Sequence, residues 1–317
     1  MRVKLLGASA GGGFPQWNCF CPNCRGLRQG TFRGKARTQS QVALSADGSA
    51  WFLLNASPDL RSQIESNPDL HPNPLAQPRD NQTRHTPIAA VVLTNADLDH
   101  VMGLLLMRES QPIHIYATES VRKILTEDNS MFKMLDQKHG QVKWTDVIPG
   151  MPFELESING VRSGITCTGF SAPCKYPIYV GEKRLLTLKQ NESVLSLILE
   201  DARTSKKMAY LPGIQSLDPV WLERLATCDL VFCDGTFWTD DELKKVSGAT
   251  RSSREMGHIP MSGPGGSVEL LSRLKKPVKV FTHINNTNPV LNEAGAEYQI
   301  ATQAGIQVGH DGMEFEC

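Results

Sequence analysis

The chain has 317 residues, of which 40% are hydrophobic and 21% charged, as in ordinary globular proteins. Its 33 Lys and Arg balance 33 Asp and Glu, and this zero net charge disfavours a nucleic-acid binder that works through bulk positive charge. The apolar stretch at the N-terminus is shorter than the roughly 7–15 residues of a signal peptide, and the longest apolar run, Val101–Met107, is far below the about 20 of a membrane span, so we expect a soluble, cytoplasmic protein.

The first strand is expected at Val3–Leu6, a short apolar run that ends at Gly7. The next residues, Gly7–Gly13, read GASAGGG. This segment lacks the Lys-Ser/Thr of a phosphate-binding loop and is not followed by a convincing helix. We therefore interpret it as a tight turn after the strand.

Three cysteines crowd the following segment, where Asn18–Cys24 reads NCFCPNC. Thiolates are soft ligands that suit zinc, and a turn with Pro and Asn lets Cys19, Cys21 and Cys24 converge. We predict that they bind a structural zinc, which ties an N-terminal loop at about residues 14–30 to the rest of the protein. A reduced loop without metal is the alternative. Four candidates remain open for the fourth ligand: Asn286, His310, Cys317 and water.

Short apolar runs bounded by polar residues, Gly or Pro predict further strands. In chain order they are Trp51–Leu54, Ile88–Leu93, Ile113–Tyr116, Val194–Leu199, Met208–Leu211, Leu230–Cys233 and Val278–Phe281. Helical patterns lie at Asp99–Glu109, Glu119–Glu127, after the N-cap pair Asp218-Pro219, and at Val268–Leu274. Strands and helices alternate loosely, which predicts an α/β or α+β fold with helices outside the sheets.

Two segments are expected to be long loops. Asn67–Pro87 contains five prolines, and Gly257–Gly266 reads GHIPMSGPGG. Loops above a rigid scaffold often carry specificity, so we expect both to roof the active site. His258, in the second loop, is a candidate acid/base or hydrogen-bond donor to substrate. A surface histidine without function is the alternative.

Polar residues follow two of the predicted strands. Thr94–His100 reads TNADLDH after the strand at Ile88–Leu93, and His283 follows the strand at Val278–Phe281. Capping of a helix by Asp97 or Asp99 would explain the acids but not the histidine. Two histidines and a carboxylate are the ligand set of a mononuclear non-haem iron site with open positions for oxygen and substrate. Uncoordinated histidines are the alternative.

These residues together resemble the metallo-β-lactamase fold, whose motif T-H-x-H-x-D-H follows a strand. Thr94, Asp99 and His100 match this motif, whereas Asn95 and Asp97 stand where the family has two histidines. His283 resembles the last metal ligand of the family. The resemblance implies an αββα sandwich, with two mixed sheets flanked by helices, formed by residues 1–317 as one domain.

The resemblance also implies that a two-metal hydrolase is incomplete here. Phe170, before Ser171-Ala172-Pro173, stands at the position of the family's middle histidine. Tyr210–Ile214 reads YLPGI and lacks the aspartate that would bridge two metals. One metal site is thus lost and part of the other remains, whereas a two-metal hydrolase uses both ions to activate its hydroxide.

Five motifs narrow the resemblance across nearly the whole chain: GASAGGGFPQWNCFCPNC, TNADLDH, GTFW, GHIPMSGPGG and THINNTNP. Together they are very similar to the family of pyrroloquinoline quinone (PQQ) biosynthesis protein B. The cysteines also resemble those of a phosphonate-pathway phosphodiesterase of the same fold, in which a late histidine completes a zinc site. Asn286 occupies the position of that histidine.

The family resemblance implies a cytoplasmic step in making PQQ from a peptide's linked Glu and Tyr. It implies a non-haem iron, oxygen-dependent hydroxylase of the tyrosine ring, with Asp99, His100 and His283 on Fe²⁺ and with Asp97 and His258 beside them. Asp97 remains open between metal ligand, partner of His100 and helix cap. The expected partners are a dipeptide-like precursor and PQQ, without nucleic acid or membrane span, and a homodimer is left open.

Two other functions remain open. A carrier would hold PQQ or its precursor and help its transport to the periplasm, and a residual metallo-hydrolase would keep part of the ancestral chemistry. Oxygen-dependent product formation favours the hydroxylase, tight PQQ binding without turnover favours the carrier, and turnover of phosphodiester or lactam substrates favours the hydrolase.

Overall fold

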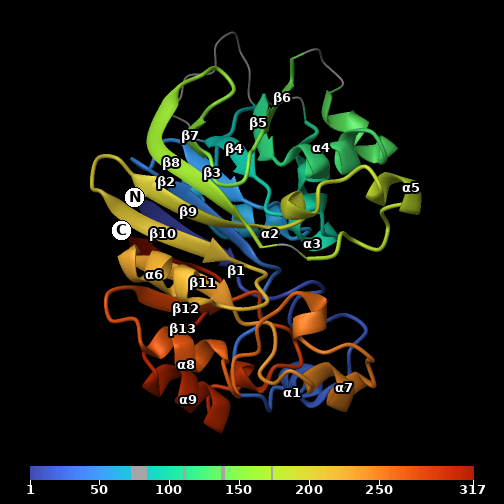
Figure 1. The fold of residues 1–317 in the computed structure, drawn as a ribbon, viewed down its shortest axis with the longest axis vertical. Coiled ribbons are helices and arrows are strands. Elements are labelled where there is room, and N and C mark those ends of the chain that lie inside the picture. The colour runs from blue at the N-terminus through green and yellow to red at the C-terminus, as the bar shows by residue number, and fades with distance from the viewer. Residues whose placement is uncertain (73–83, 110–111, 137–139, 173) are drawn as a thin grey trace.

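The computed structural model describes residues 1–72, 84–109, 112–136, 140–172 and 174–317 (Figure 1). Its strands are β1 (Arg2–Gly7), β2 (Gln41–Ser45), β3 (Trp51–Leu54), β4 (Ile88–Val92), β5 (Ile113–Ala117), β6 (Val142–Asp146), β7 (Pro152–Glu156), β8 (Arg162–Ser171), β9 (Leu195–Asp201), β10 (Lys206–Leu211), β11 (Leu230–Asp234), β12 (Val278–Thr282), β13 (Ile306–Val308) and β14 (Met313–Glu316). Its α-helices are α1 (Pro22–Arg28), α2 (Leu60–Glu65), α3 (Leu98–Val101), α4 (Glu119–Thr126), α5 (Glu182–Leu185), α6 (Pro219–Thr227), α7 (Glu242–Ser247), α8 (Ser267–Ser272) and α9 (Ala296–Gln303).

The strands form two seven-stranded mixed sheets, in the orders β14-β1-β2-β3-β4-β5-β6 and β13-β12-β11-β10-β9-β8-β7. In each sheet one half is antiparallel and the other half is parallel, from β3 to β6 and from β10 to β13. Figure 1 shows α2, α3 and α4 on one side of the strands and α6, α8 and α9 on the other. The expected αββα sandwich of two mixed sheets is confirmed.

Three apolar layers hold these elements together. Phe52 and Leu54 of β3 face Phe232 of β11 in a core between the two sheets, whereas Leu53 packs toward the helices outside the first sheet. On the outer face of the second sheet, Phe281 packs with Trp221 of α6. Strands with both faces buried carry apolar residues at every position, which explains why the sequence shows them as continuous apolar runs.

All eight strands predicted from these runs are present, with ends that differ from the predicted bounds by at most two residues. The strands that the sequence pattern missed are β2, β6, β7, β8, β13 and β14. In β6 and β8 several residues are only partly buried, so their sequences mix polar and apolar side chains. Periodicity alone therefore gives a weak strand signal there.

The predicted helix at Asp99–Glu109 is wrong in length. The α-helix α3 ends at Val101, and residues 102–107 continue as a tighter 3₁₀ helix. At this junction only glycine fits, because a Cβ on Gly103 would lie 2.3 Å from the carbonyl oxygen of Ser57. The chain passes this close since the N–H of Gly103 donates to the carbonyl of Ala56 over 2.9 Å.

The topology brings the ends of several strands to one edge of the sandwich. The chain leaves β4 toward α3, β10 toward Pro212, β11 toward Thr236 and β12 toward His283. The carboxyl ends of parallel strands meet at the same edge of a sheet, so residues far apart in sequence converge there. Among the described residues, no helix is long and apolar enough to cross a membrane.

Candidate metal centre

The structure brings together the two histidines and the carboxylate that follow β4 and β12. One donor atom from each of Asp99, His100 and His283 lies within 4.8 Å of the other two. The Oδ2 atom of Asp99 is 3.3 Å from Nε2 of His283 and 3.8 Å from Nε2 of His100. Such spacing suits donors that share one ion, since ligand bonds of about 2.1 Å leave neighbouring donors roughly 3–3.5 Å apart.

His100 has the hydrogen-bonding pattern of a metal ligand. Its Nδ1 lies 2.8 Å from the amide oxygen of Asn95, which can only accept, so Nδ1 carries the hydrogen and Nε2 keeps a lone pair. This Nε2 is buried and has no hydrogen-bond partner. Burial lowers the pKa of His100 to about 4, so the ring is neutral near pH 7. An orphaned, neutral acceptor in the interior fits a bound cation.

Asp99 supplies the negative charge. Burial would raise the pKa of this carboxyl group, but the imidazoles of His100 and His283 outweigh burial and hold its pKa well below the usual range. Gly11, in the glycine-rich segment after β1, lies against Asp99. A Cβ on Gly11 would stand 3.2 Å from Oδ2 of Asp99, so the glycine leaves the carboxylate room.

His283 is held in an unusual backbone conformation, with a φ of 55°. Left-handed backbone is costly for a residue with a side chain and persists only where the surroundings enforce it. The hydroxyl of Thr236 lies 2.9 Å from Nδ1 of His283 and 2.6 Å from a carboxylate oxygen of Asp234. The hydroxyl also donates to the carbonyl oxygen of His283 over 2.9 Å, so Thr236 holds both the backbone and the ring of His283, whose Nε2 faces Asp99.

His258 lies beside the centre, paired with Asp234. Its Nδ1 is 2.7 Å from Oδ2 of Asp234, and its ring stacks on that of His283 at 5.3 Å between centroids. Burial disfavours a charged ring, but the carboxylate of Asp234 outweighs it and raises the pKa of His258. His258 thus lies beside His283, as expected for a residue near the centre, and its chemical role stays a prediction.

Asp234 and Thr236 belong to the hydrogen-bond network around the centre, and the sequence patterns did not single them out as site residues. Asp234 is fully buried and accepts from four donors, namely the backbone N–H groups of Ile214 and Thr236, the Thr236 hydroxyl and the His258 ring. A signal was present, because Asp234 follows a buried apolar strand just as His283 does and precedes the GTFW motif. A polar residue at the end of β11 is thus expected at the same edge of the sandwich as the polar residues after β4 and β12.

The described residues offer one complete set of metal donors at this edge. Asp234, His258 and His283 also lie close together, but hydrogen bonds of 2.6–2.9 Å already occupy the facing atoms of this second group. The oxygen of Asn95, which replaces a family histidine, is used by His100 and by the N–H of Asp97. The arrangement therefore suits one ion.

Asp97 lies at the edge of this centre. It is the N-cap residue of α3, but its side chain accepts no hydrogen bond from the helix. Burial and the nearby charge of Asp99 raise its pKa to about 6. The capping interpretation is therefore wrong for its carboxylate, and no hydrogen bond joins it to His100. Its carboxyl group lines the same cavity as Asp99, and its raised pKa makes it easier to protonate than an ordinary aspartate.

A cavity of about 450 Å³ opens onto these residues. Its walls combine the candidate metal donors with residues 174–179, 212–213, 251 and 255–258. The loop at Gly257 thus contributes to the roof, as expected. The described parts of Asn67–Pro87 do not line the cavity, and residues 73–83 lie outside the described residues. The segment at 174–179, which the sequence did not single out, takes that place.

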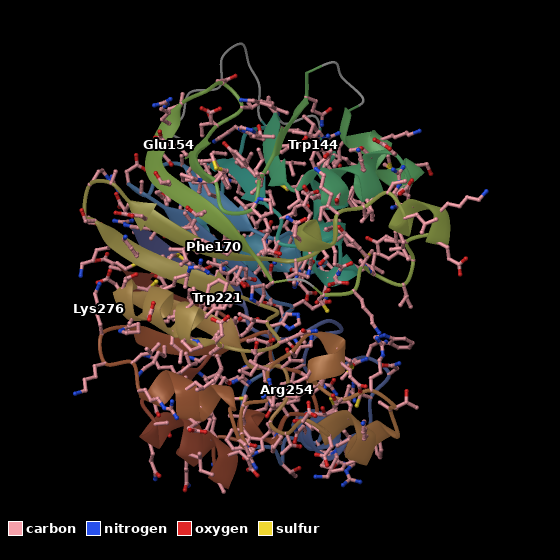
Figure 2. All side chains as sticks on the ribbon, viewed as in Figure 1. Trp144, Glu154, Phe170, Trp221, Arg254 and Lys276 are labelled. Carbon is pink, nitrogen blue, oxygen red and sulfur yellow. The ribbon has the colours of Figure 1, made fainter. Side chains whose placement is uncertain are left out.

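Phe170, at the family's middle histidine position, does not line this cavity. Its ring packs edge-on against Trp221 of α6, 5.8 Å between centroids, and the guanidinium of Arg224 lies over it at 4.1 Å. Figure 2 shows Phe170 and Trp221 next to each other where β8 passes α6. Where the family resemblance places a metal-binding histidine, this chain therefore has an aromatic side chain that packs against Trp221.

The three cysteines form a second cluster, with sulfur atoms within 4.8 Å of one another. The side-chain nitrogen of Asn286 lies 3.1, 3.6 and 3.3 Å from the sulfurs of Cys19, Cys21 and Cys24. Of the predicted protein candidates for a fourth ligand, Asn286 alone is in contact with the sulfurs. His310 instead contacts Lys35 and the carbonyl of Asp311, and Cys317 lies at the end of β14 beside Met1.

The environment of the sulfurs fits a bound cation. Burial raises the pKa of Cys21 to about 11. For Cys19, burial is outweighed by hydrogen bonds from the backbone N–H and side chain of Cys21, and the pKa falls below its ordinary value. A set of thiols that is partly buried and only partly ionised would become three thiolates when a divalent ion binds.

Known proteins resemble the chain over its whole length. Residues 50–284 match the model of the beta-lactamase superfamily domain. The chain is 39% identical to coenzyme PQQ synthesis protein B of Methylococcus capsulatus, over 99% of both chains, and 38% identical to that of Acinetobacter baumannii, over the full length of both. The crystal structure of zinc-bound PqqB from Methylobacterium extorquens superposes over 100% of both chains with a TM-score of 0.88 and 38% identity. A diphosphatase of the PhnP family shares the fold, with a TM-score of 0.64, 22% identity and coverage of 99% and 97% of the two chains.

Proposed function

The chain belongs to the family of coenzyme PQQ synthesis protein B, within the β-lactamase superfamily, and we propose that it hydroxylates a tyrosine-derived ring during PQQ synthesis. The substrate is a dipeptide-like precursor made from linked Glu and Tyr. The reaction takes place in the cavity above Asp99, His100 and His283, with iron as the metal.

One observation carries this proposal: a single set of two histidines and one carboxylate, with an orphaned buried Nε2 on His100. Two imidazoles and a carboxylate on one face suit ferrous iron and leave positions free. Fe²⁺ bound there would supply the activation of O₂. A hydrolase of this fold would need a second metal, for which the described residues offer no free donor set.

The residues around the metal donors have separate tasks. Asn95 and Thr236 fix the histidine rings so that both Nε2 atoms face Asp99. His258, held at Nδ1 by Asp234, keeps its Nε2 for exchanging a proton with the substrate. Among the described residues, Lys175 and Arg251 are cationic side chains of the cavity wall without an ion-pair partner, and they suit the carboxylates of a Glu-derived precursor.

The stoichiometry of the proposed hydroxylation determines which reagents the assay must contain. Insertion of one oxygen atom into a ring C–H bond gives a C–OH group. The other atom of O₂ leaves as water after uptake of two electrons and two protons. The structure holds no electron donor, so an external two-electron reductant is required, and ascorbate serves in the assay.

We also propose that Cys19, Cys21 and Cys24 bind a structural zinc, with Asn286 as the fourth ligand. Rotation of the Asn286 amide by half a turn would exchange nitrogen for oxygen and present an acceptor to the shared ion. Its distances of 3.1–3.6 Å from the sulfurs support this, because donors around one tetrahedral zinc ion stand about 3.5 Å apart.

The hydroxylase proposal is tested with anaerobically purified protein loaded with Fe²⁺ or with Zn²⁺. Each form receives the ring-linked Glu–Tyr dipeptide, ascorbate and ¹⁸O₂, and the product is examined by mass spectrometry. We expect heavy oxygen in the ring of the product with the iron form alone. Equal product from the zinc form, or product without oxygen, would contradict the proposal.

The same preparations separate the other functions. Binding of PQQ without turnover in the iron form would support a carrier. Hydrolysis of a phosphodiester such as bis(p-nitrophenyl) phosphate by the zinc form would support a residual hydrolase. Either result, in the absence of heavy oxygen in the product, would replace the hydroxylase proposal.

A further inference from the structure

The histidine–carboxylate centre and the cysteine cluster share one turn of the chain. This turn, residues 283–288, begins directly after β12. Its first residue, His283, faces Asp99. Three residues later, Asn286 contacts all three cysteine sulfurs. A shift of the turn at one end must therefore be absorbed within three residues or passed to the other end.

The end of the turn at His283 is held by Thr236. The hydroxyl of Thr236 lies 2.9 Å from both Nδ1 and the carbonyl oxygen of His283, and its own carbonyl accepts from the N–H of Asn285 over 3.1 Å. These contacts leave the turn little freedom beside the centre. The left-handed backbone of His283 needs such enforcement, because its φ of 55° is unfavourable for an ordinary residue.

The other end of the turn is held by the cysteine loop. Asn23, between Cys21 and Cys24, donates through its side-chain amide to the carbonyl oxygens of Asn286 and Asn288, over 3.1 and 3.0 Å. The orientation of Asn23 depends on the fold of the NCFCPNC segment, which includes the start of α1. The cysteine loop thus contacts the turn in two ways: Asn23 hydrogen-bonds to its backbone, and the three sulfurs contact the side chain of Asn286.

The segment that leads into the cysteine loop braces the same turn and also touches Asp99. The N–H of Ile284 donates to the carbonyl of Ala8, and the N–H of Ala10 donates to the carbonyl of Ile284, both over 2.9 Å. Gly11 follows at once and packs against the carboxylate of Asp99. The Ala8–Gly11 segment therefore contacts both Asp99, through Gly11, and the turn that follows His283, through Ile284.

We propose that the cysteine cluster is a positioning device for the histidine–carboxylate centre. Zinc bound by the cysteines fixes the NCFCPNC segment, and through the hydrogen bonds of Asn23 to the turn it sets the position of His283 against Asp99. This inference rests on the proposed zinc site but not on the hydroxylase chemistry. Outer contacts of metal ligands typically alter metal affinity by about 10–100-fold, which gives the size of the expected effect.

The test measures Co²⁺ binding at the histidine–carboxylate centre of the full-length, zinc-loaded protein under anaerobic conditions. Visible d–d absorption without thiolate charge-transfer bands in the near ultraviolet reports cobalt at the centre, whereas the appearance of those charge-transfer bands reports cobalt among the cysteines. Asn23→Ala removes the two hydrogen bonds from the cysteine loop to the backbone of the turn and leaves all three sulfurs in place. Cys21→Ser removes a zinc ligand, and Asn18→Ala is the matched control, since its side chain contacts only Gln16.

We expect Asn23→Ala to keep its zinc and to bind Co²⁺ at the centre about 10-fold more weakly, with a changed d–d spectrum. Cys21→Ser should lose zinc and weaken Co²⁺ binding further, and Asn18→Ala should match the wild type. Wild-type Co²⁺ affinity and spectrum in Asn23→Ala would overturn the positioning role, even if Cys21→Ser failed to fold. Full zinc content in Cys21→Ser would instead overturn the zinc site on which the inference rests.

Discussion

The two clusters of metal donors are built in opposite ways. The three sulfurs come from one segment of six residues, Cys19–Cys24, so local spacing already brings them close. At the other centre, His100 and His283 are 183 residues apart in sequence and meet because β4 and β12 end at the same edge of the sandwich. A local cluster depends on its own loop, whereas the remote one depends on the packing of two sheets.

The clusters also differ in how their surroundings treat the donor atoms. Burial keeps His100 neutral, with a pKa of about 4, and so leaves its Nε2 ready to bind a cation without losing a proton. Burial keeps Cys21 a thiol, with a pKa of about 11, so a metal must displace a proton there. Metal binding at the cysteines should thus be more sensitive to pH than at the histidines. Variants that affect one cluster or the other test this contrast.

The largest effect is expected from removing a donor of the remote centre. His283→Ala and Asp99→Ala each leave two donors, so the centre should lose its iron and oxygen-dependent hydroxylation should fall by at least about 1,000-fold. The cysteine cluster should keep one zinc per chain. Metal analysis and product formation on the same samples measure both.

His310→Ala is the matched control for these variants, because His310 is a surface histidine that belongs to neither cluster. It should keep both metals and full turnover. Hydroxylation at the wild-type rate in His283→Ala or Asp99→Ala would rule out the centre as the site of the reaction.

A smaller effect is expected from His258, which lies beside the donors without belonging to the set of three. His258→Ala should keep iron and lower kcat by about 100-fold, the size typical for loss of a proton-transfer group. Steady-state kinetics and iron content check this expectation. Turnover unchanged in both kcat and KM would remove His258 from the reaction.

Asn95 tests whether the ring orientation of His100 matters. Asn95→Ala removes the acceptor at 2.8 Å from Nδ1, so the ring is free to turn or to change tautomer, and metal affinity of the centre should fall about 10-fold. Asn95→Asp keeps an acceptor and should retain the affinity. If titration with Fe²⁺ or Co²⁺ gives equal affinities for the wild type and Asn95→Ala, the acceptor has no positioning role.

The smallest effect concerns Glu242, whose carboxylate joins Thr287 of the turn to the backbone of Trp238. Its oxygens accept from the N–H of Trp238 and the hydroxyl of Thr287, and burial raises its pKa to about 7 from an ordinary value of 4.5. The folded protein therefore holds this proton more tightly than the unfolded chain does. The stabilising contribution is complete below about pH 4.5 and is lost as pH rises through 7.

Glu242→Gln removes this titration and keeps the size of the side chain. The free energy of unfolding of the wild type should fall relative to that of the variant between pH 5 and 7, by on the order of 2 kcal/mol. Urea unfolding at a series of pH values measures the difference. A constant difference between the two proteins across this range would show that Glu242 does not titrate there.

The sequence by itself determined the elements whose signals are local. The apolar runs gave eight strands because strands buried on both faces need apolar residues at every position. Asp218 was predicted to begin a helix, and its side chain does cap α6 by accepting from Trp221. The crowded cysteines predicted a cluster because thiolates within six residues can converge in one turn. The motifs predicted the family through residues that stand next to each other.

Only the tertiary structure decided the features that depend on packing between distant segments. It selected Asn286 over His310 and Cys317 as the neighbour of the sulfurs, because β12 ends beside the cysteine loop. It revealed Asp234 and Thr236, whose importance lies in hydrogen bonds across β11 and β12. It turned Phe170 into an apolar contact with Trp221. The sequence also lacks any sign that one turn serves both clusters, because that follows from where the two sheets place their strand ends.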